Sequence, residues 1–282
     1  MVKTTIENNS VQATMVMPLW GRAKYSRKYP DLLLDPLVHD IFDRLMQDFN
    51  FDLSKAEKYY GDREEYFGLI FLARARNFDD ALQKYLQKYP KATVINLGAG
   101  LDTGFSRNDN GQLLWYDIDL PNIIELRRKY IPETARSICL SKSILDFSWM
   151  TEIKYNSQNG IFFIAGGLLM YFKEEVVQRL LISLSEKYPG GELIFDGTSK
   201  LGLKVGNKRS IKADKSEMLW YFYLKKPNKQ INQWSPKIKV IDYFPYWART
   251  KRNPIWAKST IKLIKISTFL KLGLIAHIKF LK

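Results

Sequence analysis

The stretch Val94-Ile95-Asn96-Leu97-Gly98-Ala99-Gly100-Leu101-Asp102-Thr103 decides the fold. A run that favours a β-strand, residues 93–97, leads directly into two glycines separated by one residue, Gly98 and Gly100. Glycines at this spacing let the backbone turn sharply and lie close to a ligand where a Cβ would collide. The stretch therefore predicts a strand that ends in a ligand-binding turn.

The same stretch narrows the class of ligand. Thr103 stands where the dinucleotide-binding pattern has its third glycine, and no Gly-Lys-Ser/Thr follows, as a triphosphate-binding loop would require. These features favour a ligand that contains an adenosine but no pyrophosphate.

Two acidic residues close the next predicted strand, in the sequence Trp-Tyr-Asp-Ile-Asp-Leu-Pro at positions 115–121. An acid at the end of the second strand, about twenty residues beyond the glycines, can accept hydrogen bonds from both hydroxyls of a ribose. We predict this role for Asp119. Asp117 is the alternative, either as a cap of the following helix or as the ribose ligand itself.

Outward from these motifs, strands and helices alternate. Further strands are predicted over residues 113–118, 137–140, 160–165, 192–195, 239–246 and 274–280, and helices over 29–50, 66–89, 173–187 and 258–271. Residues 218–224 are interpreted as a short aromatic helical segment. The alternation predicts an α/β fold with a doubly wound, mainly parallel sheet, which binds ligands at the carboxyl ends of its strands.

Composition limits the classes of protein. The 282 residues are 46% hydrophobic, as in a globular protein with a core. The single cysteine, Cys139, excludes a disulfide framework and a cysteine-built zinc site. Residues 1–20 lack a signal-peptide core, and the longest apolar run, 161–172, is too short to span a bilayer as a helix. We therefore expect a cytoplasmic protein without a membrane span.

The net charge of +15 comes from 44 Lys and Arg against 29 Asp and Glu, and the basic residues become denser from Lys200 onward. Such an excess is typical of proteins that meet nucleic acids, anionic membranes or acidic ligands. Without an RNA-binding signature, we favour general solubility and expect no stable nucleic-acid partner. Residues 258–271 form either a basic membrane-surface helix or, as we prefer, a helix that packs beside a final sheet strand.

Taken together, these motifs resemble the leucine carboxyl methyltransferase and polyketide O-methyltransferase family. The resemblance runs over about residues 18–197 and rests on Ala-Arg-Ala-Arg-Asn-Phe-Asp-Asp (73–80), the glycine stretch, Tyr-Asp-Ile-Asp-Leu-Pro (116–121), Ser-Ile-Leu-Asp-Phe-Ser-Trp-Met (143–150) and Gly-Leu-Leu-Met-Tyr-Phe (167–172). It implies a class I, Rossmann-like methyltransferase with a seven-stranded sheet. A helical cap over residues 1–90 and a domain over 91–282, with a lid around 200–236, would form one compact unit.

The resemblance also implies S-adenosylmethionine as the cofactor. The residues that it assigns to cofactor binding are Arg74, Gly98, Ala99, Gly100, Asp102, Asp119, Leu120, Ser143, Ile144, Asp146 and Gly166.

In this assignment the glycine turn lines the methionine end of the cofactor, and Asp102 holds the loop or the ammonium group. Residues 143–147 border the adenine, with Asp146 as the polar contact. Arg74 pairs with the methionine carboxylate, a role suited to a bidentate guanidinium, and Arg76 is the substitute. The structural alternative for both arginines is an ion pair on their own helix, with Asp79 or Asp80.

Two positions depart from the family pattern. Gly166 stands where the family has an acid that contacts the cofactor, and Ser143 replaces an acid on the adenine side. A charged hydrogen bond contributes roughly 1.5–3 kcal/mol, so either change weakens cofactor contacts unless another side chain compensates. A weaker enzyme and a non-catalytic relative are the other interpretations.

We predict an O-methyltransferase that acts on a small molecule or an exposed carboxylate, with catalysis by orientation and exclusion of water. A binding protein without turnover and an RNA methyltransferase are the alternatives. Tyr171 is predicted to position the acceptor, unless it is a core tyrosine. The aromatic N-terminal helices and residues 220–224 are predicted to wall the acceptor pocket.

Polar residues outside the motifs give weaker predictions. Arg22 and Lys24 either attract a carboxylate or form a solvated helix face. His39 and His277 are expected to be packing residues rather than bases.

Overall fold

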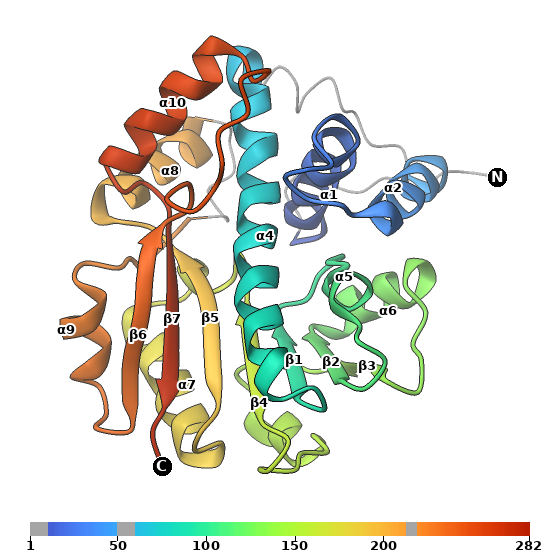
Figure 1. Ribbon diagram of the computed structural model, residues 1–282, viewed down its shortest axis with the longest axis vertical. Coiled ribbons are helices and arrows are strands. Elements are labelled where there is room, and N and C mark those ends of the chain that lie inside the picture. Colours follow the sequence, from blue (N-terminus) through green and yellow to red (C-terminus); the bar gives the residue numbers. More distant parts are fainter. Residues whose placement is uncertain (1–10, 50–59, 213–218) are drawn as a thin grey trace.

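The computed structural model describes residues 11–49, 60–212 and 219–282, and its centre is a single sheet (Figure 1). Seven strands lie in the order β3-β2-β1-β4-β5-β7-β6. They are β1 (Thr93–Leu97), β2 (Leu114–Asp119), β3 (Ser137–Ser141), β4 (Ile161–Ala165), β5 (Glu192–Gly197), β6 (Ile238–Pro245) and β7 (Leu274–Phe280). The pairs among β1 to β5 are parallel, and β7 is antiparallel to both neighbours. The predicted doubly wound, mainly parallel sheet is confirmed.

Helices and short 3-10 turns connect the strands. They are α1 (Val11–Lys28), α2 (Pro36–Asp48), η1 (Gly61–Arg63), α4 (Glu64–Lys88), α5 (Gly104–Asn108), α6 (Pro121–Tyr130), η2 (Phe147–Thr151), η3 (Leu169–Tyr171), α7 (Glu174–Lys187), α8 (Lys200–Lys212), α9 (Pro227–Asn232) and α10 (Lys258–Phe269).

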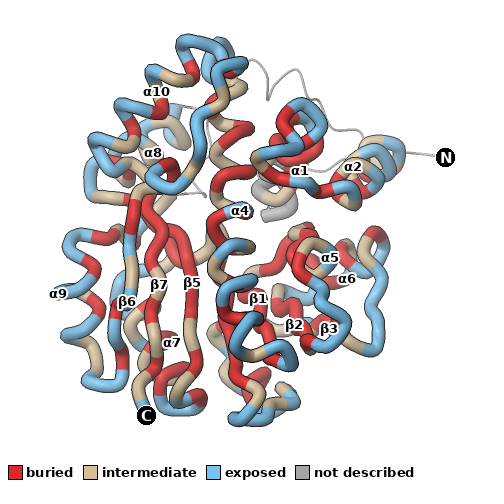
Figure 2. The backbone as a smooth tube through the Cα atoms, viewed as in Figure 1, coloured by how far each residue is buried: buried red, intermediate tan, exposed pale blue. Residues whose placement is uncertain are grey.

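The two faces of the sheet build separate cores because successive side chains of a strand point to opposite faces. Every residue of the central strands β1 and β4 is buried, and the wholly apolar sequence of β4 is typical of a strand covered on both faces (Figure 2). On one face, Ile95 and Phe163 pack in a cluster with apolar residues of α7 and α9. On the other face, Val94 and Phe162 pack in a cluster with residues of α4 and α10. Helices on both faces leave the ends of the strands open for a site.

The N-terminal helices differ from the prediction. A single helix over residues 29–50 is wrong: α2 begins at Pro36, and residue 50 lies outside the described residues. Proline disfavours helical backbone in the residue before it and is itself well suited to the first helical position, so the helix starts at Pro36. The helix predicted over 66–89 is confirmed as α4, which ends before Pro90.

The C-terminal third differs at one point. Residues 219–224 form no helix; their backbone runs beside η3, and the N–H of Tyr221 donates to the carbonyl of Met170 at 2.7 Å. Met218 lies outside the described residues. By contrast, α10 and β7 form as preferred, with the helix packed on α4 and the strand inside the sheet.

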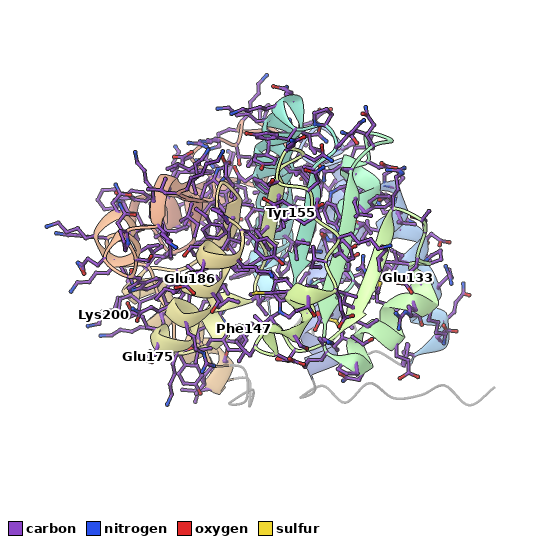
Figure 3. All side chains as sticks on the ribbon, turned by 90° about the horizontal axis from the view of Figure 1, so that it is seen from below. Glu133, Phe147, Tyr155, Glu175, Glu186 and Lys200 are labelled. Atoms are coloured by element: carbon purple, nitrogen blue, oxygen red, sulfur yellow. The ribbon has the colours of Figure 1, made fainter. Side chains whose placement is uncertain are left out.

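Figure 3 shows the molecule from below, with residues labelled on both sides of the sheet. Glu175 and Glu186 on α7 lie on the same side as Lys200 at the start of α8, and Glu133, which precedes edge strand β3, lies on the opposite side. Within the described ranges, none of the helices combines the length and the apolar character needed to cross a bilayer.

Candidate functional site

The turn after β1 has the backbone that only glycine adopts readily. Gly98 and Gly100 have φ angles of +64° and +48°. A Cβ on Gly98 would lie 2.7 Å from the Cδ1 of Leu168, and one on Gly100 would lie 3.2 Å from the side chain of Met15. Both glycines and Ala99 line a cavity of about 520 Å³. The turn therefore forms a wall of the cavity that has no room for larger residues.

Asp119 lies beside this turn at the end of β2. One carboxylate oxygen accepts the N–H of Gly100 at 2.8 Å and the other accepts the N–H of Leu120 at 2.8 Å. Burial raises the pKa of Asp119, and the two N–H donors oppose that shift. A carboxylate has about four acceptor positions, so Asp119 retains capacity toward the cavity that it lines.

Asp117 is a structural residue. Its side chain is buried away from the cavity and accepts from the side chains of Asn96 at 2.9 Å, Trp115 at 2.9 Å and Arg127 at 2.6 Å. It neither caps the next helix nor reaches the cavity, so both roles considered for it are wrong in this structure.

Asp102 holds the loop after the glycines. Its carboxylate accepts the N–H of Gly104 at 3.1 Å and pairs with Arg22 of α1 at 2.7 Å. Arg107 adds a longer contact of 3.4 Å, and Asp35 pairs with both arginines at 3.2 Å. Arg22 is therefore buried inside an ion-pair cluster that joins α1 to the loop.

Arg22 and Lys24, for which the sequence left the same two alternatives open, lie in different surroundings. The solvated helix face considered for Arg22 is wrong, since its side chain is only 6% exposed. Lys24 does lie on the exposed side of α1, where it pairs with Glu64 at 2.6 Å.

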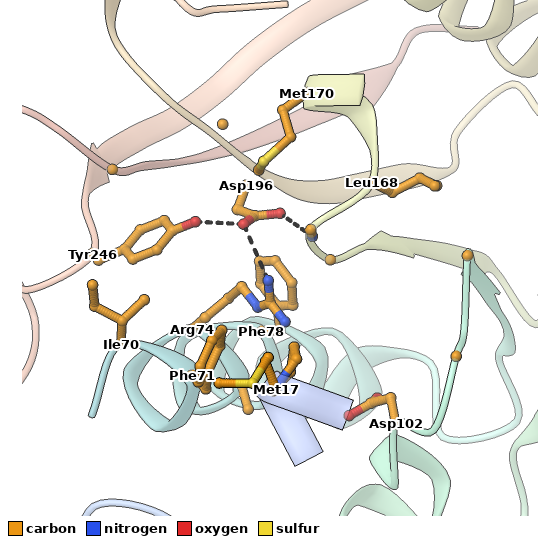
Figure 4. Close-up of a pocket in the computed structure, with 18 of the residues that line it drawn as sticks. Met17, Ile70, Phe71, Arg74, Phe78, Asp102, Leu168, Met170, Asp196 and Tyr246 are labelled. Atoms are coloured by element: carbon orange, nitrogen blue, oxygen red, sulfur yellow. Dashed lines mark hydrogen bonds and ion pairs between the residues drawn. The ribbon is translucent and has the colours of Figure 1, made fainter. Parts of the chain in front are cut away.

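A second polar cluster lies across the cavity. Arg74 of α4 forms an ion pair of 3.5 Å with Asp196, near the carboxyl end of β5. Asp196 also accepts the N–H of Gly167 and the hydroxyl of Tyr246, as drawn in Figure 4. Burial and the negative charge of Asp196 raise the pKa of Tyr246 well above its ordinary value. Tyr246 therefore remains a neutral hydroxyl that donates to Asp196.

The ion-pair alternative considered for the two arginines holds for only one of them. Arg76 is exposed and pairs with Asp80 at 2.8 Å on its own helix. Arg74 pairs with neither Asp79 nor Asp80, and its side chain lines the cavity.

Gly166 lines the cavity between these groups. A Cβ there would lie 3.0 Å from the ring of Phe78 and 4.0 Å from the Nε of Arg74. The space for a larger side chain is therefore partly filled by Phe78. A carboxylate does reach this region from the neighbouring strand β5. It is that of Asp196, which accepts the N–H of Gly167, the residue after Gly166.

Aromatic side chains form much of the remaining wall. Phe67 and Phe71 of α4, Tyr171 of η3 and Trp220 line the cavity. Tyr171 is half-buried and faces this space rather than the core, and burial raises its pKa. Of the predicted segment 220–224, Phe222 is fully buried in the sheet core, so only part of that segment faces the cavity.

Four of the predicted cofactor residues are not among those that line the cavity. Leu120 is exposed after β2, and Ile144 is buried in the core. Asp146 is exposed and caps η2 by accepting the N–H of Ser148 at 3.1 Å, and Ser143 accepts the N–H of Leu145 at 3.2 Å. Their roles in cofactor binding stay predictions.

Sequence reasoning missed Asp196, Tyr246 and the buried role of Arg22. Asp196 could have been predicted, because it directly follows the predicted strand 192–195, at the sheet edge where parallel strands bind ligands. Tyr246 and Arg22 could not, since their partners are distant in sequence. Neither His39 nor His277 lines the cavity.

Several known proteins are similar to this chain. Tetracenomycin polyketide synthesis O-methyltransferase TcmP of Streptomyces glaucescens is 27% identical over 193 residues, which cover 68% of this chain and 67% of that protein. The S-adenosyl-L-methionine-dependent methyltransferase dpfgK of Gibberella zeae is 23% identical over 235 residues, 78% of each chain. A DUF574 family protein of Streptomyces avermitilis shares the fold, with a TM-score of 0.58 at 9% identity over 93% of this chain and 100% of that one.

The profile of one family matches a continuous stretch that contains the glycine turn, Asp119, Arg74 and Tyr171. That stretch is residues 15–185, more than half of the chain. The chain thus belongs to the leucine carboxyl methyltransferase family.

Proposed function

We propose that this S-adenosylmethionine-dependent methyltransferase binds its methyl donor along the glycine turn and transfers the methyl group to an oxygen of a small, largely apolar acceptor. The observation that carries the proposal is the pairing of two sites in one cavity. The close-packed turn at Gly98 with Asp119 forms one site, and the buried Arg74–Asp196 pair forms the other.

The residues of the cavity fit the donor's chemistry from end to end. Asp119 offers acceptor capacity for the ribose hydroxyls, and Arg74 offers a cation for the methionine carboxylate. Asp196 retains one of about four acceptor positions for the methionine ammonium, since three are taken by Gly167, Tyr246 and Arg74. We assign to Asp196 the role that an acid at position 166 would have.

The acceptor is assigned to the aromatic part of the cavity. Phe67, Phe71 and Trp220 offer flat apolar surface, which suits an apolar or aromatic molecule. The bound donor supplies an electrophilic methyl group on a positively charged sulfur. The walls hold the acceptor oxygen in line with it and keep water out.

Whether the reaction needs a base depends on whether the acceptor oxygen carries a proton. A carboxylate acceptor is ionised at neutral pH and needs no base, whereas a phenol or alcohol must lose a proton. Tyr171 is placed to orient the acceptor oxygen, and its raised pKa keeps it protonated as a hydrogen-bond donor. We therefore propose a carboxylate or an acidic phenol as the acceptor. TcmP, an O-methyltransferase by name, supports oxygen as the methylated atom.

The binding protein without turnover is the second candidate, and Gly166 is the observation that favours it. Asp196 weakens that case, because it supplies a carboxylate in the same region.

Calorimetric titration with S-adenosylhomocysteine tests the donor site. We expect binding to the wild type in the micromolar range and a loss of at least about tenfold in Asp119→Ala, the size of one charged hydrogen bond. Glu125→Gln, on the exposed side of the helix that follows the loop, is the matched control and should bind like the wild type. No binding by a folded wild-type protein would refute the proposal.

A further inference from the structure

The charge of the chain is strongly divided. Residues 197–282 contain 20 Lys and Arg but only 3 Asp and Glu, whereas residues 1–196 contain 24 and 26. The C-terminal part therefore carries +17 and the rest −2. A lysine-rich composition inherited from the whole proteome would affect both parts alike. The division points to a local function of the basic part.

Helix α10 places this charge on an exposed stripe. It buries Thr260 and Ile264 toward α4, which leaves Lys258, Lys262 and Lys265 exposed on other sides. Ile266 and Phe269 continue the same stripe at helical spacing, and Phe269 is 85% exposed. Large apolar side chains and lysines thus share one solvent-facing surface.

Helix α8 repeats the pattern. Four exposed lysines alternate with exposed apolar residues along it, and Ile211 is 62% exposed. The lysines are Lys200, Lys204, Lys208 and Lys212, and two further apolar residues are Leu201 and Val205. Among the described residues, no carboxylate lies within ion-pair distance of any lysine of α8 or α10.

The two helices lie at the same end of the molecule, beyond the carboxyl end of β5 (Figure 1). The hydroxyl of Thr198, just before α8, donates to the carbonyl of Leu272, just after α10, at 2.6 Å. We call the exposed lysines and apolar residues of these two helices the α8–α10 face. Val205 on this face also lines the cavity, so the face borders the candidate site.

We propose that the α8–α10 face binds the surface of a membrane rich in anionic phospholipids. Apolar tips such as Phe269 enter the boundary of the acyl chains, and lysines beside them extend their ammonium groups to the lipid phosphates. A second copy of this chain would bring the same positive face against it, which charge repulsion opposes. Nucleic acid would satisfy the lysines but would leave the exposed isoleucines and Phe269 in water.

Vesicle co-sedimentation of the full chain tests the proposal. We expect binding to vesicles of equimolar phosphatidylcholine and phosphatidylserine, weaker binding as salt increases, and little binding to phosphatidylcholine alone. Each lysine near the surface contributes about fivefold in affinity, so Lys258→Gln/Lys262→Gln/Lys265→Gln should bind about a hundredfold more weakly. Phe269→Ser should weaken binding without any change of charge.

A control triple variant with the same loss of charge makes the result specific. Lys84→Gln/Lys91→Gln/Lys187→Gln changes exposed lysines near the amino ends of the strands and should bind like the wild type. Equal losses in both triple variants, or no binding to the anionic vesicles, would overturn the proposal. So would an affinity for homopolymeric RNA that exceeds vesicle binding, or a dimer in sedimentation that Phe269→Ser abolishes.

The donor titration keeps this inference separate from the proposed function. Vesicle binding needs no methyl donor, so a protein that binds vesicles but not S-adenosylhomocysteine refutes the proposed function alone.

Discussion

The guanidinium of Arg127 donates to the carboxylate of Asp117 at 2.6 Å, and both side chains are 1% exposed. Its other terminal nitrogen donates to the carbonyls of Gly100 and Asp102 at 2.9 and 2.8 Å. One arginine of α6 therefore ties the interior of β2 to the back of the glycine turn. The turn is held from behind by the core, and only its front faces the cavity.

Removal of this arginine should destabilise the whole fold. Arg127→Met leaves the Asp117 carboxylate buried without its cation, and a broken buried pair costs about 3–5 kcal/mol. Urea denaturation should show that loss in the free energy of unfolding. Arg128→Met, which removes the exposed neighbour and its pair with Glu133, should change it by less than ~1 kcal/mol. Equal stability of the two variants would contradict the anchoring role.

Replacement of Gly98 by alanine should damage the site more than a comparable change elsewhere. Gly98 and Gly111 both have positive φ, but a Cβ on Gly111 has nothing within 4 Å, whereas one on Gly98 meets Leu168. Both variants carry the cost of the left-handed backbone, about 1 kcal/mol. We expect only Gly98→Ala to lose further stability and to bind S-adenosylhomocysteine more weakly in calorimetry. Wild-type affinity in Gly98→Ala would place the donor on another loop.

The two halves of the donor should respond to different variants. Asp196→Asn should weaken S-adenosylhomocysteine by about tenfold or more, since a charged hydrogen bond is lost. It should leave 5′-methylthioadenosine unaffected, because this ligand lacks the amino-acid end. Asp119→Ala should weaken both ligands in the same titration. The assignment of Asp196 fails if its variant weakens both ligands equally.

Asp102 should make the fold sensitive to acid. Burial raises the pKa of its carboxyl, but Arg107 and Arg22 outweigh this, so the pKa lies well below the ordinary 3.8. The folded state then binds this proton less readily than the unfolded chain. The stabilisation is therefore present above about pH 4 and is lost as the pH falls further. Urea midpoints measured from pH 6 downward, in steps of about one unit, should fall more steeply for the wild type than for Asp102→Asn. Parallel pH profiles would rule out this contribution.

Trp220 should matter for the acceptor alone. Its ring packs against Gly206 of α8 and lines the aromatic part of the cavity. We expect Trp220→Ala to keep the wild-type affinity for S-adenosylhomocysteine and to yield less labelled product from a cell extract supplied with labelled S-adenosylmethionine. A loss of donor affinity would mean that the aromatic part of the cavity also binds the donor.

Much of the fold could be predicted because its signals are local. The glycine turn needs only the rule that positive φ favours glycine, and the buried strand β4 needs only its run of apolar residues. The end of a helix was predictable at Pro90, but the start at Pro36 was missed. The apolar periodicity, at Leu37, Ile41, Phe42 and Leu45, begins only after Pro36, and the prediction extended the helix back to residue 29 without its support.

The candidate site was predictable only where partners are close in sequence. Asp119 was placed correctly beside the glycine turn because consecutive parallel strands end at one edge. The ion pair between Arg74 and Asp196 joins residues that are 122 positions apart, and the buried pair of Arg22 with Asp102 joins residues 80 positions apart. Such contacts depend on how helices dock on the sheet, which no local pattern specifies.

The position of β7 between β5 and β6 has a consequence for biosynthesis. This strand is the last of the seven along the chain, yet it occupies an interior place in the sheet. A ribosome-bound nascent chain that has not yet released residues 274–280 holds both neighbouring strands without their shared hydrogen-bonding partner. The sheet is therefore completed only once residues 274–280 have emerged, and until then the unpaired backbone of two strands is open to chaperones.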